Sequence, residues 1–439
     1  MADQWVSFLM RTGPNKEKQN IIWNMIGSFC YALASMVLSF LVLRIAGKEQ
    51  GGIFAFGYST FGHQMFLLAY FAIRPFHITD GKGEYQFGDY LHHRYRTCLL
   101  ALFVGAGYLL ISGYSLQKAG IIFLLVCYKI IDGFADVYDS EFQRNGNLHL
   151  TGKSNTFRTL LSVSVFLVIL AATQNLLAAC AAIVAAQAVG VFFFDQIVMK
   201  RLPGIDYGWS KDHMISLSLG TVLLFFSAFL DFYIFSAAKY AIDSCMDDVA
   251  SGYFNVIFMP TSVINLAAGF VIRPILTRLT ADWNKGRFRR FTRLLFGISG
   301  LIAGLSIVAV FMTWLIGKPV LGVMETILGA SYKGSLTIYY PSFVLIVLGG
   351  GFYAFLNLYY YVLVIFRRQK VIFGIELALT FAAAWLAPWL VERRGIPGAA
   401  WAYVILMSLM AVGFVTGAWF GYRQGKAGRM DVQEEDEKK

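Results

Sequence analysis

The chain of 439 residues is 57% hydrophobic and only 14% charged, and its mean hydropathy is +0.60. Soluble domains carry about 25% charged residues, so this composition excludes a soluble domain and predicts a membrane protein with several spanning helices. The net charge of +11 does not indicate nucleic-acid binding, because the basic residues lie between apolar stretches, where membrane topology explains them.

The apolar stretches predict an all-α polytopic membrane protein with twelve spanning helices. They cover residues 21–45, 53–73, 97–113, 119–137, 159–172, 176–198, 215–238, 252–272, 294–316, 335–366, 371–390 and 399–420. The span at 159–172 is short. The span at 335–366 is long and carries three consecutive glycines at 349–351, where we expect the helix to bend or break.

One five-residue motif, the repeated phrase of this chain, occurs as FAIRP at 71–75 and as FVIRP at 270–274. Each copy closes an apolar run, each precedes a basic segment, and their separation is nearly half the chain. Such a repeat predicts two homologous halves, which in transporters place the substrate path at their interface. We expect an N-terminal six-helix lobe (1–210), a C-terminal six-helix lobe (211–422) and a disordered cytosolic tail (423–439).

The distribution of Lys and Arg predicts the orientation. With both termini in the cytosol, the inner segments hold about 28 of the 37 basic residues. The outer loops are short, and no soluble domain is expected within them. We therefore predict a multi-pass protein of a bacterial plasma membrane with the N- and C-termini inside.

Charged residues within spans are costly, so each is a candidate for function. Lys129 lies mid-span, and Asp132 follows on the same helical face. Lys129 can attract a phosphate as a point charge in a central cavity. The alternative is an internal ion pair with Asp132 that orients the helix and contacts no ligand.

Three arginines lie at predicted span ends. Arg44 is near the outer end of the first span, where it lines the mouth of a cavity or extends to lipid headgroups. Arg74 and Arg273 occupy the same place in the two copies of the repeat. One interpretation is a shared role in gating or in binding an anionic headgroup. The alternative is that both arginines only anchor the topology of the chain.

Further polar residues lie inside apolar runs. Asp231 and Glu376 are lone acids that can carry a proton for coupling or can bond to a neighbouring helix. His63, Gln64 and Asn255 either line the path or join helices.

The acidic run from 132 to 141 has no histidine at ligand spacing, so we predict no metal site there. Asp195 is expected at the membrane interface. The sequence contains no Walker loop, zinc motif or nucleophile with its base, so we predict neither an enzyme nor a cofactor.

Four stretches in this order resemble Wzx-type polysaccharide flippases of the multidrug/oligosaccharidyl-lipid/polysaccharide (MOP) exporter superfamily. The basic loop is closest to the Gram-positive branch that flips teichoic acid or capsule repeats. The stretches are NMIGS at 24–28 with LRIAG at 43–47, the loop with Arg74, Thr79, Asp80, Tyr85, Phe87, Asp89, Tyr90 and Arg94, GKPVLG at 317–322 with Tyr332 and Lys333, and GIPGAAWAY at 395–403.

The resemblance implies a MATE-like fold whose two lobes move a polyprenyl-pyrophosphate-linked oligosaccharide to the outer leaflet by alternating access through a cationic cavity. Lys129, with Arg44 and Arg74 behind it, is the expected pyrophosphate contact. Asp80 and Asp89, in the basic loop, are assigned to coupling or gating. The implied partners are the lipid-linked glycan, membrane lipids and other proteins of envelope glycan synthesis, with H⁺ or Na⁺ as a coupling ion.

Three other functions stay open. A drug/cation antiporter of the same superfamily requires acidic cavity residues, whereas the basic inner loops and Lys129 point to an anion. A membrane-embedded glycan polymerase or ligase generally needs a large outer loop. A non-transporting scaffold derived from a flippase is the third.

Overall fold

The computed structural model describes the backbone of residues 2–13, 15–80 and 83–437. Side chains of residues 2–4, 270, 273, 274 and 428–437 lie outside the described part. The described residues form helices and turns without a strand, which confirms the all-α fold.

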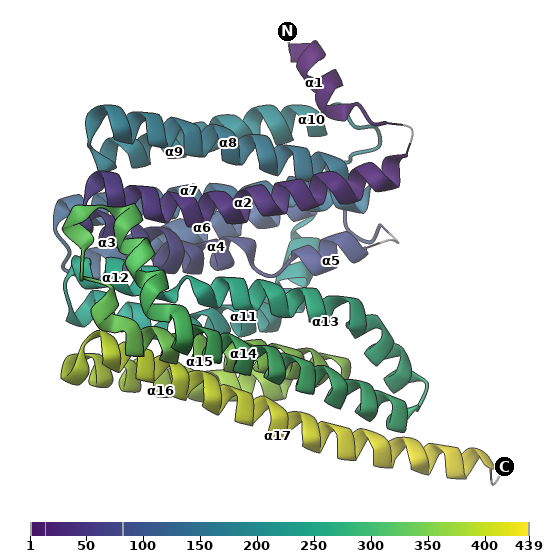
Figure 1. Cartoon of the computed structure of the whole chain (residues 1–439). Coiled ribbons are helices and arrows are strands. Elements are labelled where there is room, and N and C mark those ends of the chain that lie inside the picture. The colour runs from purple at the N-terminus through teal and green to yellow at the C-terminus, as the bar shows by residue number, and fades with distance from the viewer. Residues whose placement is uncertain (1, 14, 81–82, 438–439) are drawn as a thin grey trace. The chain divides into compact units, whose positions relative to one another are not determined.

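The chain divides into two compact units, Met1–Phe229 and Leu230–Lys439. The helices of the first unit run nearly antiparallel, and the division falls inside α11 (Figure 1). The first unit contains α1 (Ala2–Met10), α2 (Lys16–Ala46), α3 (Lys48–Phe56), η1 (Gly57–Phe61), α4 (Gly62–Tyr70), α5 (Arg74–Thr79), α6 (Phe87–Ile111), α7 (Leu116–Arg144), α8 (Leu148–Thr173), α9 (Leu176–Gly190), η2 (Val191–Gln196), α10 (Ile197–Met199) and the start of α11 (Lys211–Cys245).

The second unit contains the rest of α11 and α12 (Asp248–Phe258), α13 (Pro260–Asn284), α14 (Phe288–Leu328), η3 (Ala330–Tyr332), η4 (Thr337–Tyr339), α15 (Tyr340–Ile365), α16 (Gln369–Arg394) and α17 (Ile396–Glu437). Ten helices along the described chain are long and apolar enough to cross a membrane. The other two predicted spans coincide with α7, which carries Lys129 and several aspartates, and with the continuous segment α3–η1–α4.

Local sequence signals explain where several helices begin. The Asn15 side chain accepts a hydrogen bond from the Lys18 amide (3.0 Å) at the start of α2. Asp247 accepts one from the Ala250 amide (2.8 Å) at the start of α12. Such N-caps satisfy amide groups that the helix itself leaves without a partner.

Glycines allow helices to touch backbone to backbone. A Cβ on Gly27 of α2 would lie 2.7 Å from the carbonyl oxygen of Gly152 in α8. The expected break at glycines 349–351 does not occur, because α15 runs through them without interruption. A Cβ on Gly349 would lie 2.5 Å from the Tyr403 ring, so this glycine serves close packing instead.

The two copies of the repeated phrase have different backbone structures. In the first copy, Phe71 (φ 51°) and Ala72 (φ 50°) are left-handed and separate α4 from α5. The second copy lies within the single helix α13. Two consecutive left-handed residues that are not glycine are strained, because the Cβ approaches the following carbonyl.

Two π-helical segments interrupt the first unit. η1 carries Tyr58, and η2 carries Asp195. An extra residue in a helical turn changes the direction in which a side chain points, and such segments are frequent at functional sites. Both of these side chains belong to the polar network described next.

Candidate functional site

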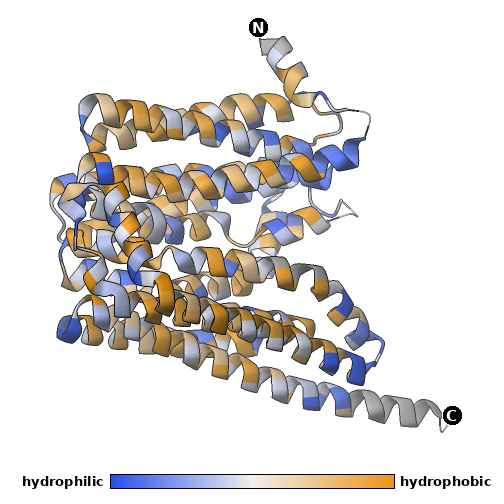
Figure 2. Cartoon of the chain, in the orientation of Figure 1, coloured by the Kyte–Doolittle hydropathy of each residue, from blue (hydrophilic) through white to orange (hydrophobic). Residues whose placement is uncertain are grey.

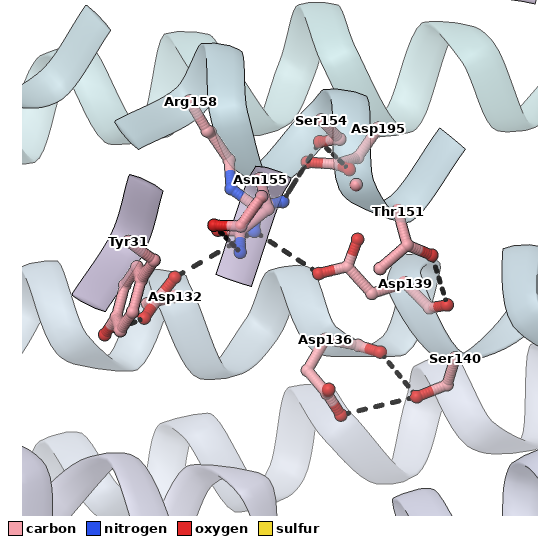
Figure 3. Close-up of polar contacts among 12 residues, drawn as sticks. Tyr31, Asp132, Asp136, Asp139, Ser140, Thr151, Ser154, Asn155, Arg158 and Asp195 are labelled. Carbon is pink, nitrogen blue, oxygen red and sulfur yellow. Dashed lines mark hydrogen bonds and ion pairs between the residues drawn. The ribbon is translucent and has the colours of Figure 1, made fainter. Parts of the chain in front are cut away.

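A buried arginine lies at the centre of a polar network within the first unit. Arg158 of α8 is only 2% exposed, and its guanidinium contacts three aspartates (Figure 3). Its Nη1 is 2.6 Å from Asp195 Oδ2, and its Nη2 is 3.3 Å from Asp139 Oδ2 and 4.0 Å from Asp132 Oδ1. Ser154 Oγ donates to the other oxygen of Asp195 (2.5 Å). The cluster therefore joins α7, α8 and η2.

Lys129 of α7 lies in a cage of tyrosines. Its side chain is 3% exposed, and its Nζ is 3.9 Å from the centroid of the Tyr58 ring. The rings of Tyr31 and Tyr128 lie at 5.4 and 5.6 Å. These distances are within cation–π range, so the rings stabilise the ammonium group away from water.

Lys129 is connected to Asp132 through a hydroxyl. Its Nζ donates to Tyr31 Oη (3.0 Å), and this hydroxyl donates to Asp132 Oδ2 (2.9 Å). The two residues share a helical face, as the spacing predicts. In the described part of the chain, however, they are bridged by Tyr31 and do not form a direct ion pair.

Asp136 binds two arginines from different helices. Arg74 Nη1, at the start of α5, is 2.5 Å from Asp136 Oδ1, and Arg94 Nη2 of α6 is 3.0 Å from Oδ2. Arg94 also donates to the Ala69 carbonyl (2.9 Å), near the strained end of α4. These bonds hold the helix break in place.

The network is balanced in charge. It contains four cationic and four carboxylate side chains, namely Lys129, Arg74, Arg94, Arg158, Asp132, Asp136, Asp139 and Asp195. Buried charges persist only when they are paired and hydrogen-bonded. Among the described residues, Lys129 differs from the three arginines, because tyrosines and no carboxylate contact its ammonium group.

Asp80 organises the first basic loop. It accepts hydrogen bonds from the amides of Glu84 (2.9 Å) and Tyr85 (3.0 Å), from Tyr90 Oη (3.2 Å) and from Arg144 (3.3 Å). Burial alone would raise the pKa of Asp80, but the amides of Tyr85 and Glu84 and the Arg144 guanidinium outweigh it, so its pKa lies below the ordinary value.

Asp89 attaches the start of α11 to the first basic loop. It is fully buried and accepts from the Gln86 amide (3.0 Å), the Ser210 amide (2.7 Å) and His213 Nδ1 (2.9 Å). Gly88 also donates to the Asp206 carbonyl (3.0 Å). The connection between the predicted lobes is therefore bonded to α6, and is no free linker.

The remaining candidates of the first unit lie in separate surroundings. Gln64 is buried and donates to the Phe229 carbonyl (2.9 Å). His63 is half-buried, and its ring stacks on Phe66 with 5.3 Å between centroids. Arg44 is exposed near the C-terminal end of α2.

Two acids of the second unit lie near the same tyrosines. Asp231 of α11 accepts from Tyr353 Oη (3.0 Å), and Glu376 of α16 is fully buried. Both carboxylates are within electrostatic range of Tyr353 and Tyr360.

The other two candidates of the second unit lie on α12 and α13. Asn255 of α12 is buried and accepts from Lys239 Nζ (3.4 Å). Arg273 lies in α13, and its side chain is outside the described part of the chain.

Sequence reasoning missed Arg158 and misplaced Asp195. Asp195 was expected at the interface, but it is fully buried and paired with Arg158. The predicted span at 159–172 is too short to cross a bilayer, so its helix had to extend beyond these residues. This shortness was the sequence signal that could have placed Arg158 inside the helix. α8 begins at Leu148 and so carries Arg158 deep into the helix.

No family model and no curated protein sequence matches the chain. Solved structures do resemble it. A eukaryotic MATE transporter has a TM-score of 0.63 and 13% identity, over 94% of this chain and 99% of that one. A Vibrio cholerae MATE transporter in its bent form has a TM-score of 0.55 and 15% identity, over 97% and 98% of the two chains.

A MOP superfamily transporter from Pyrococcus furiosus has a TM-score of 0.55 and 14% identity, over 96% and 98% of the two chains. Inward-facing and outward-facing structures of a multidrug resistance MATE transporter also share the fold. At these identities the likeness establishes the fold alone. This chain is a multi-pass membrane protein with the fold of MATE and other MOP transporters.

Proposed function

We propose that the chain is a flippase that moves a polyprenyl-pyrophosphate-linked oligosaccharide from the inner to the outer leaflet by alternating access. The observation that carries the proposal is the buried ammonium of Lys129, which is surrounded by tyrosines and lacks a direct carboxylate partner among the described residues. The fold of MOP transporters and the resemblance of the basic loop to teichoic acid and capsule flippases support it.

The chemistry of this substrate matches the site. A pyrophosphate with attached sugars cannot cross hydrocarbon unaided, and a buried cation offsets much of that desolvation cost. Sugar rings pack well on aromatic faces, and Tyr31, Tyr58 and Tyr128 surround the cation. In this proposal the pyrophosphate takes over part of the contact that Lys129 makes with Tyr31.

We assign supporting substrate contacts to other predicted residues. Among them, Arg74 is bound to two side chains of the first unit. Its bonds to Asp136 and Gln143 leave its side chain 27% exposed. Arg44, Arg273, His63, Gln64 and Asn255 complete the proposed path.

We also propose coupling to H⁺ or Na⁺. Asp231 and Glu376, which lie near shared tyrosines, are the proposed carriers in the second unit. Asp132, through Tyr31, connects the proposed substrate cation to the carboxylate network. Asp80 and Asp89 are proposed to gate the cytosolic side, because they hold the basic loop and the start of α11.

A drug/cation antiporter is the second candidate function. The acids Asp231 and Glu376 favour it, and several structures with this fold are described as multidrug transporters. The Pyrococcus furiosus relative in fold is described as having a binding pocket of reversed polarity and a different function. We propose a bacterial plasma membrane location with both termini in the cytosol for either function.

The test compares proteoliposomes that contain a fluorescent polyprenyl-pyrophosphate oligosaccharide. Wild type, Lys129→Ala and Lys129→Arg are assayed for lipid exposed on the opposite leaflet. Lys118→Ala, which removes a lysine from the end of the same helix α7, is the matched control. We expect flipping to fall at least tenfold in Lys129→Ala, to recover partly in Lys129→Arg and to persist in Lys118→Ala.

Three results would count against parts of the proposal. Flipping unchanged in Lys129→Ala would keep the flippase and leave Lys129 a structural role. A loss of flipping in Lys129→Ala that only follows a loss of its thermal stability would make the role of Lys129 structural. No flipping, together with proton-driven uptake of a cationic dye, would identify the antiporter.

A further inference from the structure

A set of exposed arginines lies on the second unit, in two of its turns and in the helices α14 and α17. We call it the basic collar: Arg287, Arg289, Arg290, Arg293, Arg367 and Arg423. Figure 2 shows hydrophilic residues around the turn between α13 and α14. Arg287 lies in this turn, and Arg289, Arg290 and Arg293 lie in the first two turns of α14. The others lie at the turn between α15 and α16 and on α17.

The collar has very little neutralising charge. Among the described residues, the carboxylate that pairs with it is Asp282, which is 4.0 Å from Arg287 and 3.5 Å from Arg290. Several arginines of the first unit are instead paired with carboxylates. Arg94 and Arg158 are buried against aspartates, and Arg144 pairs with Asp80 and Glu141.

The collar is built on a rigid aromatic base. Trp283 is 4% exposed, and its ring centroid is 4.2 Å from that of Phe366, 5.4 Å from that of Phe291 and 6.0 Å from that of Tyr422. Thr292 Oγ1 also donates to Tyr422 Oη (3.2 Å). These contacts attach the turns after α13 and α15 to the part of α17 around Tyr422, so the segments that carry the six arginines are packed together.

The backbone at Arg367 is a second, independent observation. Arg367 has φ 57°, and the amides of Arg367 and Arg368 donate to the carbonyls of Val364 and Leu363 (2.9 Å each). This is the helix-ending pattern in which glycine is the usual left-handed residue. An arginine there is strained, and such strain indicates a use for its side chain.

We propose that the basic collar binds the phosphates of anionic phospholipids in the cytosolic leaflet. Its residues flank predicted spans at their cytosolic ends, where headgroups lie, and the proposal rests on the predicted orientation. Guanidinium groups pair well with phosphate oxygens. The proposed lipid site is distinct from the proposed substrate path, because its residues lie outside the spans predicted from the sequence. It would anchor the inner end of the second unit to the leaflet.

The test uses the purified full-length protein in neutral detergent. Bound lipids are counted by native mass spectrometry during titration with phosphatidylglycerol or with phosphatidylcholine of the same acyl chains. The collar variant combines Arg287→Gln, Arg289→Gln, Arg290→Gln and Arg293→Gln. The matched control removes four exposed cations of the first unit: Lys16→Gln, Lys18→Gln, Arg96→Gln and Lys200→Gln.

We expect wild type and the control to prefer phosphatidylglycerol, and the collar variant to bind it at least about tenfold more weakly. Arg367→Gly is a second variant, which keeps the turn and removes one charge. We expect it to bind phosphatidylglycerol more weakly while its thermal stability stays equal or rises.

Three outcomes would overturn the proposal. Equal losses in the collar variant and the control would mean general charge attraction. No preference for phosphatidylglycerol would exclude a lipid site. Binding that appears only after deletion of residues 431–439 would assign the collar to that acidic segment.

Discussion

Arg158 shows how one buried residue organises the first unit. Its guanidinium pairs with Asp195 and Asp139 and approaches Asp132, and so connects two helices and a π-helical segment. Removal of one partner from such a cluster leaves uncompensated charge in a low-dielectric interior, which is much costlier than loss of a surface ion pair. Arg158 is therefore expected to be a determinant of folding, whereas Lys129 is the expected determinant of transport.

Arg158→Met is expected to destabilise the protein by about 3–5 kcal/mol, because Asp139 and Asp195 lose their buried cation. Thermal unfolding in detergent, followed by fluorescence-detected size exclusion after heating, measures the effect. Arg96→Met, at an exposed position of α6, is the control and should change the midpoint little. Adding Asp139→Asn and Asp195→Asn to Arg158→Met should recover much of the loss. An unchanged midpoint in the single variant would contradict the structural role.

The repeated phrase is the main finding at the scale of elements. Its first copy breaks the chain between α4 and α5 with two left-handed residues, while its second copy lies inside α13. Two nearly identical sequence motifs therefore adopt two different backbone structures. In the first copy, Arg94 donates to the Ala69 carbonyl and pairs with Asp136, and these bonds supply the energy that holds the strained turn.

Ala72→Gly is expected to stabilise the protein by about 1 kcal/mol, because glycine adopts the left-handed conformation without a Cβ clash. Ala69→Gly, three residues earlier and inside α4, is the matched control and should destabilise by about 1 kcal/mol. The thermal midpoint measures both. Equal destabilisation by the two substitutions would indicate that residue 72 is helical, as in the second copy.

The whole molecule has the fold of MATE and other MOP transporters, in two units that each contain their own packed helices. Its orientation in the membrane is a prediction from the loop charges. Gly113 and Gly146 lie in the turns at opposite ends of α7 and have nearly equal φ values of 67° and 69°. A Cβ on either would meet nothing within 4 Å, so the two sites form a matched pair.

With both termini in the cytosol, Gly113→Cys is expected to react with a membrane-impermeant maleimide added to intact cells. Gly146→Cys should react only after the membrane is permeabilised. Both variants are made in a background in which the five native cysteines are replaced. The reverse labelling pattern would invert the orientation, and would place the basic collar on the outer side.

The sequence by itself determined the membrane class, the helical fold and the approximate spans. Long apolar runs allow few structures in a bilayer, where every backbone group must be satisfied within a helix. It also indicated Lys129 and Asp132 as candidates, because a charge in an apolar run is conspicuous. Only the tertiary structure decided the partners of these charges: Tyr31 between them, and Arg158 with Asp195 in place of an interfacial aspartate. Partners on helices far apart in sequence are selected by packing, which no local pattern encodes.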